Sequence, residues 1–418
     1  MLRVRAISLL IFLVCAGTRI SLAQTDPVLE RYITLALAQN PRIAAAASRT
    51  EAAAERVPQM SALPDPMLGF GLKELSLNDP TLTATEMTGR WISLEQEFPF
   101  PGKRGLSKRM AEADRDMTAA EADETRAMLI ADVKMAYYEW AYLRAATDPV
   151  QQSKELMRHS ADLAASALSV GVGSQSDVLR AQTELTRFDV ELSDLRQREQ
   201  TAIADINVCC TIPLGTQTTP PSPLEYRPVN ISYDSLLAMI EQNAPRARMA
   251  SFRVAASQSD AALAKRGYLP DLRVGVEYMR RGKAEPEDMV SLMVGTSLPL
   301  YWRRSQDRAL EEKRIEHRRA REEQQSVAND LRFELTDLWA KAASLREQIE
   351  TYENGIVPQA QQTFEAAQAG YVTGRVDFMT LVSAQMMWLE AERDRLMKVA
   401  DYNTTWGRIE ALAGQRVP

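Results

Sequence analysis

The sequence predicts an α+β membrane protein that consists mostly of long coiled-coil helices and contains four transmembrane β-strands per chain. Three observations lead to this fold class. The 418-residue chain consists of two similar halves, in which equivalent segments recur at a spacing of roughly 200 residues. Each half contains two strand-like segments of about ten residues, and each half then continues into a long helical pattern.

The tandem repeat is visible in segments that recur in the same order along the chain. Residues 39–72 resemble residues 242–278, and both segments contain the triplet Leu-Pro-Asp. Further on, Phe98-Pro99 aligns with Leu298-Pro299. Ordered matches at nearly one spacing predict two tandem structural repeats.

The first 23 residues are expected to be a secretory signal peptide. Two arginines precede an apolar stretch at residues 7–14, and small residues follow up to Ala23, where we expect cleavage. Cys15 raises the alternative of a lipoprotein. Val14 precedes it, however, where lipoprotein signals carry a small residue, so an unlipidated chain is the favoured interpretation.

We expect repeat 1 to span residues 24–215 and repeat 2 to span residues 216–418. Each repeat is expected to contain a β-hairpin, a long helical hairpin and a tip where the helical hairpin turns. In repeat 1 these are expected at about 66–98, 104–211 and 170–177, and in repeat 2 at about 271–298, 303–413 and 370–377.

Four segments alternate apolar and polar residues. In residues 272–278, for example, Leu272, Val274, Val276 and Tyr278 share one face. This length and alternation are typical of strands in outer-membrane barrels, although strands of soluble sandwiches alternate as well. Four strands cannot close a barrel, and an open sheet edge is not tolerated in lipid. The barrel is therefore expected to be shared among two, three or four chains.

The helical segments carry heptad spacing and are unusually long. Residues 104–170 would extend roughly 100 Å as one helix. The returning residues 176–211 are shorter, so we expect them to stack end to end with residues 246–267 against the long helix. In repeat 2 an unbroken coiled-coil seam is predicted at Leu331, Leu335, Leu338, Ala342, Leu345, Ile349 and Tyr352.

Other classes of protein lack support in the sequence. We find no phosphate-binding glycine loop, nucleophile elbow or zinc-ligand spacing, so we expect no enzymatic activity and no cofactor. The net charge of −6 disfavours a nucleic-acid partner. Cys209 and Cys210 are adjacent, which excludes a disulfide framework, and we expect them to be small buried side chains.

The whole mature chain resembles the TolC family of outer-membrane efflux proteins. The residues that carry the resemblance are the duplicated Asn-Pro and Leu-Pro-Asp segments, "EFPFPGKRG" at 97–105, "VGVGSQSDVLRAQTEL" at 170–185 and "AGYVTGRVDFMTLVSAQ" at 369–385. The resemblance implies a homotrimer with a twelve-stranded barrel in the bacterial outer membrane and a helical α-barrel crossing the periplasm. It also implies a passive efflux duct that docks to a periplasmic adaptor and an inner-membrane pump of the RND type.

Within this family, the short chain with "PFPGKR" most resembles members that serve heavy-metal pumps of the copper/silver or cobalt/zinc/cadmium type. Drug or bile-salt efflux and type I secretion remain alternatives within the same fold. A periplasmic coiled-coil adaptor or scaffold protein is the alternative from another class. It would explain the heptads and the export signal, but it would not explain four alternating strands.

The resemblance also implies which residues dock the adaptor and which gate the pore. The adaptor-docking tip is expected at Val170, Gly171, Val172, Gly173, Asp177, Tyr371 and Gly374. Family members carry a ring of aspartates just beyond the second turn. Here Thr380 and Ser383 stand at that place and Asp377 lies one turn earlier, so Asp377 is the candidate for any remaining carboxylate gate.

The strand pattern also predicts a set of four basic residues with a shared role. Lys103, Arg104, Arg303 and Arg304 follow the strands directly, at a predicted helix N-terminus where positive charge is unfavourable. They are expected either to bind headgroup phosphates of outer-membrane lipid or to pair with acidic residues of a neighbouring helix.

Four methionines stand at the alternate positions that form the polar, lumen-facing side of the predicted strands. Thioethers are soft ligands suited to Cu(I), although methionine is also an adaptable filler of irregular space, which is the favoured interpretation. These residues are Met67, Met279, Met289 and Met293.

Overall fold

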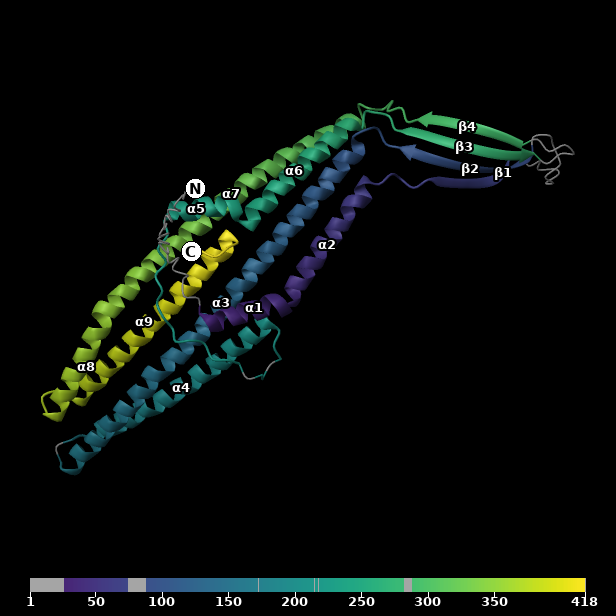
Figure 1. Ribbon diagram of the computed structural model, residues 1–418. Coiled ribbons are helices and arrows are strands. Elements are labelled where there is room, and N and C mark those ends of the chain that lie inside the picture. Colours follow the sequence, from purple (N-terminus) through teal and green to yellow (C-terminus); the bar gives the residue numbers. More distant parts are fainter. Residues whose placement is uncertain are drawn as a thin grey trace, which may run out of the picture.

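The computed structural model describes residues 26–73, 88–171, 173–213, 215–216, 218–281 and 288–417. The expected signal peptide, Cys15 and Val172 lie outside these residues. The molecule is elongated, with a β-sheet at one end and the turns of two helical hairpins at the other (Figure 1). Among the described helices, none is both long enough and apolar enough to cross a membrane.

The sheet contains four antiparallel strands in the order β1-β2-β3-β4. They are β1 (Met67–Lys73), β2 (Gly89–Phe98), β3 (Leu272–Arg281) and β4 (Asp288–Thr296). β2 and β3 come from different halves of the chain, and their pairing begins with Phe98 opposite Leu272. In the described part of the chain, the outer edges of β1 and β4 have no strand partner.

The register places apolar side chains of all four strands on one face, as the alternation predicted. Phe70 lies opposite Ile92. Ile92 in turn lies opposite Tyr278, which lies opposite Val290 on the last strand. The exposed apolar residues of this face are Leu68, Phe70, Leu72, Ile92, Leu94, Leu272, Val276, Tyr278, Val290, Leu292 and Val294.

The helices of the first half are α1 (Pro27–Gln39), α2 (Pro41–Ser61), α3 (Lys103–Ser169) and α4 (Gln175–Cys210). α3 is one continuous helix of 67 residues. α2 packs along the half of α3 near the sheet, and α4 packs along the half near the tip (Figure 1). The long helix therefore packs against the two shorter helices that were expected to stack along it, α4 and α6, and it also packs against α2 and against α9 of the second half.

The helices of the second half are α5 (Tyr233–Asn243), α6 (Pro245–Arg266), α7 (Gln306–Thr351), α8 (Val357–Val372) and α9 (Phe378–Ala413). α7 begins at Gln306, so the prediction that Arg303 and Arg304 stand in the first turn of a helix was wrong. They lie in a preceding turn, because the carbonyl of Tyr301 accepts hydrogen bonds from the backbone N–H groups of Arg304 and Ser305 (3.0 and 3.1 Å).

The seam predicted for α7 is buried from Leu331 to Ile349, but it is not continuous beyond that point. Two heptads after Ile349 end at residue 363, but the next large buried residue is Phe364, one residue further along. A π-helical turn at Tyr352–Ile356, labelled η1, accommodates the extra residue. Pro358 explains its position, since proline cannot donate a backbone hydrogen bond and its ring crowds the carbonyl four residues earlier.

The apolar core consists of two main clusters, and residues of α9 from the second half join the one built mainly by the first half. Val133, Tyr137 and Trp140 of α3 are buried against α1, α4 and α9, and Trp140 donates to Glu199 of α4 (3.1 Å). A second cluster joins α5, α7 and α9. Cys210 is fully buried, as expected, whereas Cys209 is half-buried.

The segment between α4 and α5 forms hydrogen bonds to several helices in the middle of the molecule. The backbone N–H of Ser222 donates to the hydroxyl of Tyr137 (2.9 Å), which donates to the carboxylate of Asp26 (2.5 Å). Further along, the N–H of Val229 donates to the hydroxyl of Tyr402 on α9 (3.1 Å). The segment thereby connects α3, α9 and the start of α1.

Candidate functional site

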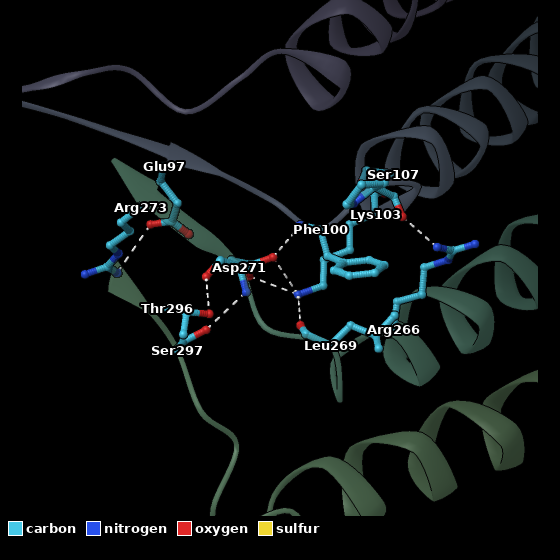
Figure 2. Close-up of polar contacts among 11 residues, drawn as sticks. Glu97, Phe100, Lys103, Ser107, Arg266, Leu269, Asp271, Arg273, Thr296 and Ser297 are labelled. Atoms are coloured by element: carbon cyan, nitrogen blue, oxygen red, sulfur yellow. Dashed lines mark hydrogen bonds and ion pairs between the residues drawn. The ribbon is translucent and has the colours of Figure 1, made fainter. Parts of the chain in front are cut away.

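The junction between sheet and helices contains a compact polar cluster centred on Asp271 (Figure 2). Lys103, the first residue of α3, places its ammonium 2.8 and 2.9 Å from the two carboxylate oxygens of Asp271. The backbone N–H of Phe100 donates to the same carboxylate (2.6 Å), and Lys103 also donates to the carbonyl of Leu269 (2.9 Å). This cluster joins the end of β2 to the start of β3.

The charge on Asp271 is stabilised by these contacts. Partial burial acts to raise the pKa of Asp271, but the hydrogen bonds from Lys103 and Phe100 outweigh it and leave the pKa below its ordinary value. Nearby, Arg266 of α6 donates to the carbonyl of Pro101 (2.6 Å). The chain reversal between β2 and α3 is therefore held from both sides.

The four basic residues predicted to act together have different surroundings. Lys103 is bound to Asp271, and Arg104 donates two hydrogen bonds to the carbonyl of Ser61 at the end of α2 (2.8 and 2.6 Å). Arg303 instead lies 5.1 Å from the ring centre of Trp302. Arg303 and Arg304 are both exposed in the turn before α7.

That turn presents apolar and aromatic side chains outward. Tyr301 is 79% exposed and Leu300 is 74% exposed, beside the half-exposed Trp302. Aromatic side chains next to arginines are typical of the interface between a lipid bilayer and water. This surface stands at the end of β4, at the same end of the sheet as the cluster around Asp271.

The polar face of the sheet is organised around Trp91. A Cβ atom added at Gly71 would lie 2.9 Å from Nε1 of Trp91, and one added at Gly69 would lie 2.9 Å from the same ring. The two glycines therefore leave the space in which the indole lies flat across β1. No local pattern singles out this tryptophan, because its partners become neighbours only through strand pairing.

The four methionines occupy two rows of this polar face. Met279 lies opposite Met289, and Trp91 lies opposite Met279 on its other side. Met293 lies opposite Gly275, and Met67 lies at the far end of that row, opposite Glu95. The strands thus bring Met279 and Met289 together but keep Met67 apart from the other three. Across the described residues, no three His, Cys, Asp or Glu side chains gather in a way that could hold a metal ion.

The two tips lie at the opposite end of the molecule from the sheet (Figure 1). The turn after α3 passes through Gly171 (φ +79°), and the turn after α8 passes through Gly374 (φ +72°), a left-handed conformation that favours glycine. Val170 is strongly exposed at the first tip. Tyr371 packs edge-on against the buried ring of Phe378, with 5.5 Å between ring centres.

The candidate gate residue Asp377 is the N-cap of α9. Its carboxylate accepts from the backbone N–H of Thr380 (2.9 Å) and from the Thr380 hydroxyl (2.5 Å). These hydrogen bonds, together with the positive charge of Arg180, lower the pKa of Asp377. Ser383 is exposed one turn further along α9.

Contacts between the tips involve a residue that sequence reasoning missed. Arg180 of α4 contacts the sulfur of Met379, next to Asp377. Tyr371 has a raised pKa, first because of burial and second because of the nearby charge of Asp177 from the other tip. The structure therefore brings the first and second tips together, which neither motif indicates by itself.

Comparison with known proteins agrees with this architecture. Protein CyaE of Bordetella pertussis (strain Tohama I) is 24% identical over 328 residues, which cover 75% of this chain and 68% of that protein. The solved outer-membrane channel OprN superposes with a TM-score of 0.79 at 17% identity, covering 93% of this chain and 90% of OprN.

Two further solved structures have the same fold. CusC superposes with a TM-score of 0.79 at 14% identity and covers 94% of this chain and 93% of its own. The outer membrane protein VceC from Vibrio cholerae superposes with a TM-score of 0.78 at 17% identity, covering 94% of this chain and 97% of VceC.

The family model described as outer membrane efflux protein matches the chain in two segments, residues 32–207 and 236–415. These segments include α3, α7, α8, α9 and nearly all of α4, together with all four strands. The chain therefore belongs to the outer membrane efflux protein family.

Proposed function

We propose that this protein is the outer-membrane duct of a tripartite efflux system, that it works as a homotrimer, and that heavy-metal cations are its cargo. In this proposal the sheet is one third of a barrel in the outer membrane and the helices form a conduit through the periplasm. The duct has no energy source of its own, so a partner pump in the inner membrane must drive export.

The two-faced sheet is the observation that carries the proposal. One face is apolar and exposed over all four strands, and the other face carries Glu95, Glu277, Ser93 and Ser291. A sheet of this kind suits lipid on one side and water on the other. Its two open edges favour assembly with further copies, because unpaired backbone groups are very costly in lipid.

The tips are the proposed docking site for a periplasmic adaptor. They lie farthest from the sheet, and Val170 and Val372 expose apolar surface there (72% and 66%). Exposed valines at a helical turn suit contact with the apolar end of another helical hairpin. Asp377, with Arg180 beside it, is the proposed remnant of a charged constriction.

The heavy-metal cargo is supported by the sequence resemblance and by the methionines on the polar face. Met279 and Met289 are cross-strand neighbours, so two thioethers line the same part of the proposed lumen. Thioethers are soft ligands that suit cations such as Cu(I). The headgroup role remains proposed for Arg304, which stands in the same turn as the exposed aromatic residues Tyr301 and Trp302.

Two experiments test this function in sequence. Membrane fractionation with a carbonate wash should leave the protein in the outer membrane, and release by the wash would instead favour a periplasmic scaffold. A deletion strain should then be grown with and without the complementing gene on copper, silver, cobalt, zinc, cadmium, bile salts and dyes.

We expect sensitivity to one group of metals. Sensitivity to bile salts and dyes alone would assign a drug-efflux role, and growth equal to the parent on every compound would favour a secretion duct. Replacement of all four methionines by isoleucine should lower silver or copper tolerance. If tolerance is unchanged, the methionines only fill space.

A further inference from the structure

We infer that Asp65 of one protomer and Arg303 of the next protomer form an intersubunit ion pair equivalent to Lys103–Asp271. This inference rests on the proposed assembly of several copies around a closed barrel. To that assembly it adds two details. One is the ion pair that stabilises each subunit boundary, and the other is the register in which β4 pairs with β1 of the next copy.

The boundary between β2 and β3 supplies the pattern. β2 ends at Phe98, and Lys103 is the fifth residue after it. Asp271 stands directly before β3 as the last residue of a Leu-Pro-Asp triplet. Where the two strands begin their pairing, the lysine and the aspartate meet.

The two open edges of the sheet carry the same elements. Asp65 is the last residue of the other Leu-Pro-Asp triplet and comes just before β1. Arg303 is the fifth residue after Leu298, which aligns with Phe98 at the end of the strand. Closing the sheet by pairing β4 with β1 of another copy would bring these two residues to the same end of the new strand pair.

Both residues are available for such a contact. In the part of the chain that the structure describes, neither Asp65 nor Arg303 has an ion pair or a side-chain hydrogen bond, and both are exposed. Lys103 and Asp271, by contrast, are only 16% and 25% exposed in their side chains. Arginine also suits this position, because its planar guanidinium can hold a carboxylate with two hydrogen bonds.

The turn before α7 is compatible with this reach. α3 begins at Lys103, whereas α7 begins only at Gln306, so Arg303 lies in a turn outside the helix. The turn and the long arginine side chain give the guanidinium more freedom to approach a carboxylate than a residue inside a helix would have.

The register of the new strand pair follows from the same equivalence. Within one chain, Phe98 lies opposite Leu272. Because Leu298 aligns with Phe98, and Pro66 follows Asp65 as Leu272 follows Asp271, Leu298 would lie opposite Pro66 of the next copy. Continuing along the strands places Thr296 opposite Leu68 and Val294 opposite Phe70.

This register keeps apolar residues together, since Phe70 and Val294 both belong to the exposed apolar face (81% and 67% exposed). A slip by one residue would turn one strand's apolar side chains into the lumen.

Disulfide trapping tests the register in the full-length protein. Cys15, Cys209 and Cys210 are first replaced by serine, and then Leu68→Cys is combined with Thr296→Cys. Residues directly opposite in antiparallel strands are close enough for a disulfide. We expect oxidation to yield linked dimers and trimers on a denaturing gel.

The matched control combines Leu68→Cys with Gly295→Cys, which corresponds to a slip of one residue and places the thiols on opposite faces. It should give no linked product. Linking by the control pair instead of the test pair would overturn the proposed register.

Charge exchange tests the ion pair itself. Asp65→Arg or Arg303→Asp alone should lower the fraction of oligomer on a native gel by about tenfold, because all boundaries of the assembly lose their pair at once. The double variant Asp65→Arg/Arg303→Asp should restore the oligomer to near the wild-type level. The milder variant Asp65→Asn guards against misfolding and should weaken the oligomer without reversing charge.

The outcomes separate this inference from the proposed function. If oligomer forms normally in both single variants, or if the double variant is no better than the single ones, the ion pair is wrong while the duct stands. If the wild-type protein in detergent forms no oligomer at all, the proposed assembly itself fails.

Discussion

Lys103 and Asp271 are 168 residues apart in the sequence, yet the ammonium of Lys103 bridges both carboxylate oxygens of Asp271. The pair closes the only place in the described part of the chain where a strand of the first half pairs with a strand of the second. Through Phe100 and Leu269 it also orients the entry into α3 and the exit from α6.

Removal of this pair is expected to destabilise the junction. Asp271→Asn keeps the shape of the side chain but loses its charge, so we expect the free energy of unfolding to fall by about 1–3 kcal/mol. Thermal unfolding of the detergent-solubilised protein, followed by circular dichroism, measures the change. Glu112→Gln is the control, because its ion pair with Lys108 is exposed on α3 (3.5 Å) and should contribute less than about 0.5 kcal/mol. Equal effects of the two substitutions would contradict the assigned role.

A pH dependence is expected from Asp26. Burial acts to raise its pKa, but hydrogen bonds from Tyr137, Ser222 and the first turn of α1 lower it below the ordinary value of 3.8. A carboxyl with a depressed native pKa stabilises the fold above its unfolded pKa and loses that contribution as the pH falls through the native pKa.

Asp26→Asn should therefore be less stable than wild type at pH 7, and the difference should shrink progressively below pH of about 4. Melting temperatures of both proteins at pH 7, 4 and 3 provide the test. A difference that stays constant across this range would show that the charge of Asp26 does not matter.

The space above Gly71 is expected to be filled by Trp91 so closely that a methyl group cannot be added. Gly71→Ala should cost about 1–3 kcal/mol, because the indole must shift. Trp91→Leu in the same protein should recover much of the loss.

Gly105→Ala serves as the control, since a Cβ at Gly105 has no neighbour within 4 Å and alanine favours the helix. Folding yield into detergent and the melting temperature would report both effects. If Trp91→Leu leaves the Gly71→Ala defect unchanged, the indole is not the obstacle.

Deletion of Gly355 is expected to be tolerated. It removes the extra residue that η1 accommodates, so Ile349 and Phe364 would stand two heptads apart and both stay on the buried side, while Pro358 would still interrupt the backbone hydrogen bonds between α7 and α8. The melting temperature should stay within a few degrees of wild type.

Deletion of Ala343, an exposed residue of α7, is the matched control. It rotates Leu345 and Ile349 out of the seam relative to Leu338, and we expect a loss of several kcal/mol, in the range of about 2–5 for one large buried side chain. If both deletions are equally harmful, η1 is required for more than register.

The residues that were placed correctly from the sequence are those whose position depends on neighbours only a few residues away. The apolar face of the strands follows from alternation, and the buried seam of α7 follows from heptad spacing, so both could be identified from neighbours a few residues away. The resemblance to outer-membrane efflux proteins is likewise confirmed by the family match. The heavy-metal cargo, the docking tip and the gate remain predictions.

The sequence by itself determined the two faces of the sheet, the long helices and the family, because periodicity and motif are properties of the chain. Only the tertiary structure decided that Lys103 binds Asp271 rather than a lipid phosphate, that Trp91 lies over two glycines, and that Arg180 reaches the second tip. Each of these contacts depends on strand order and helix packing between segments far apart in sequence, and the local pattern of the chain carries no information about such distances.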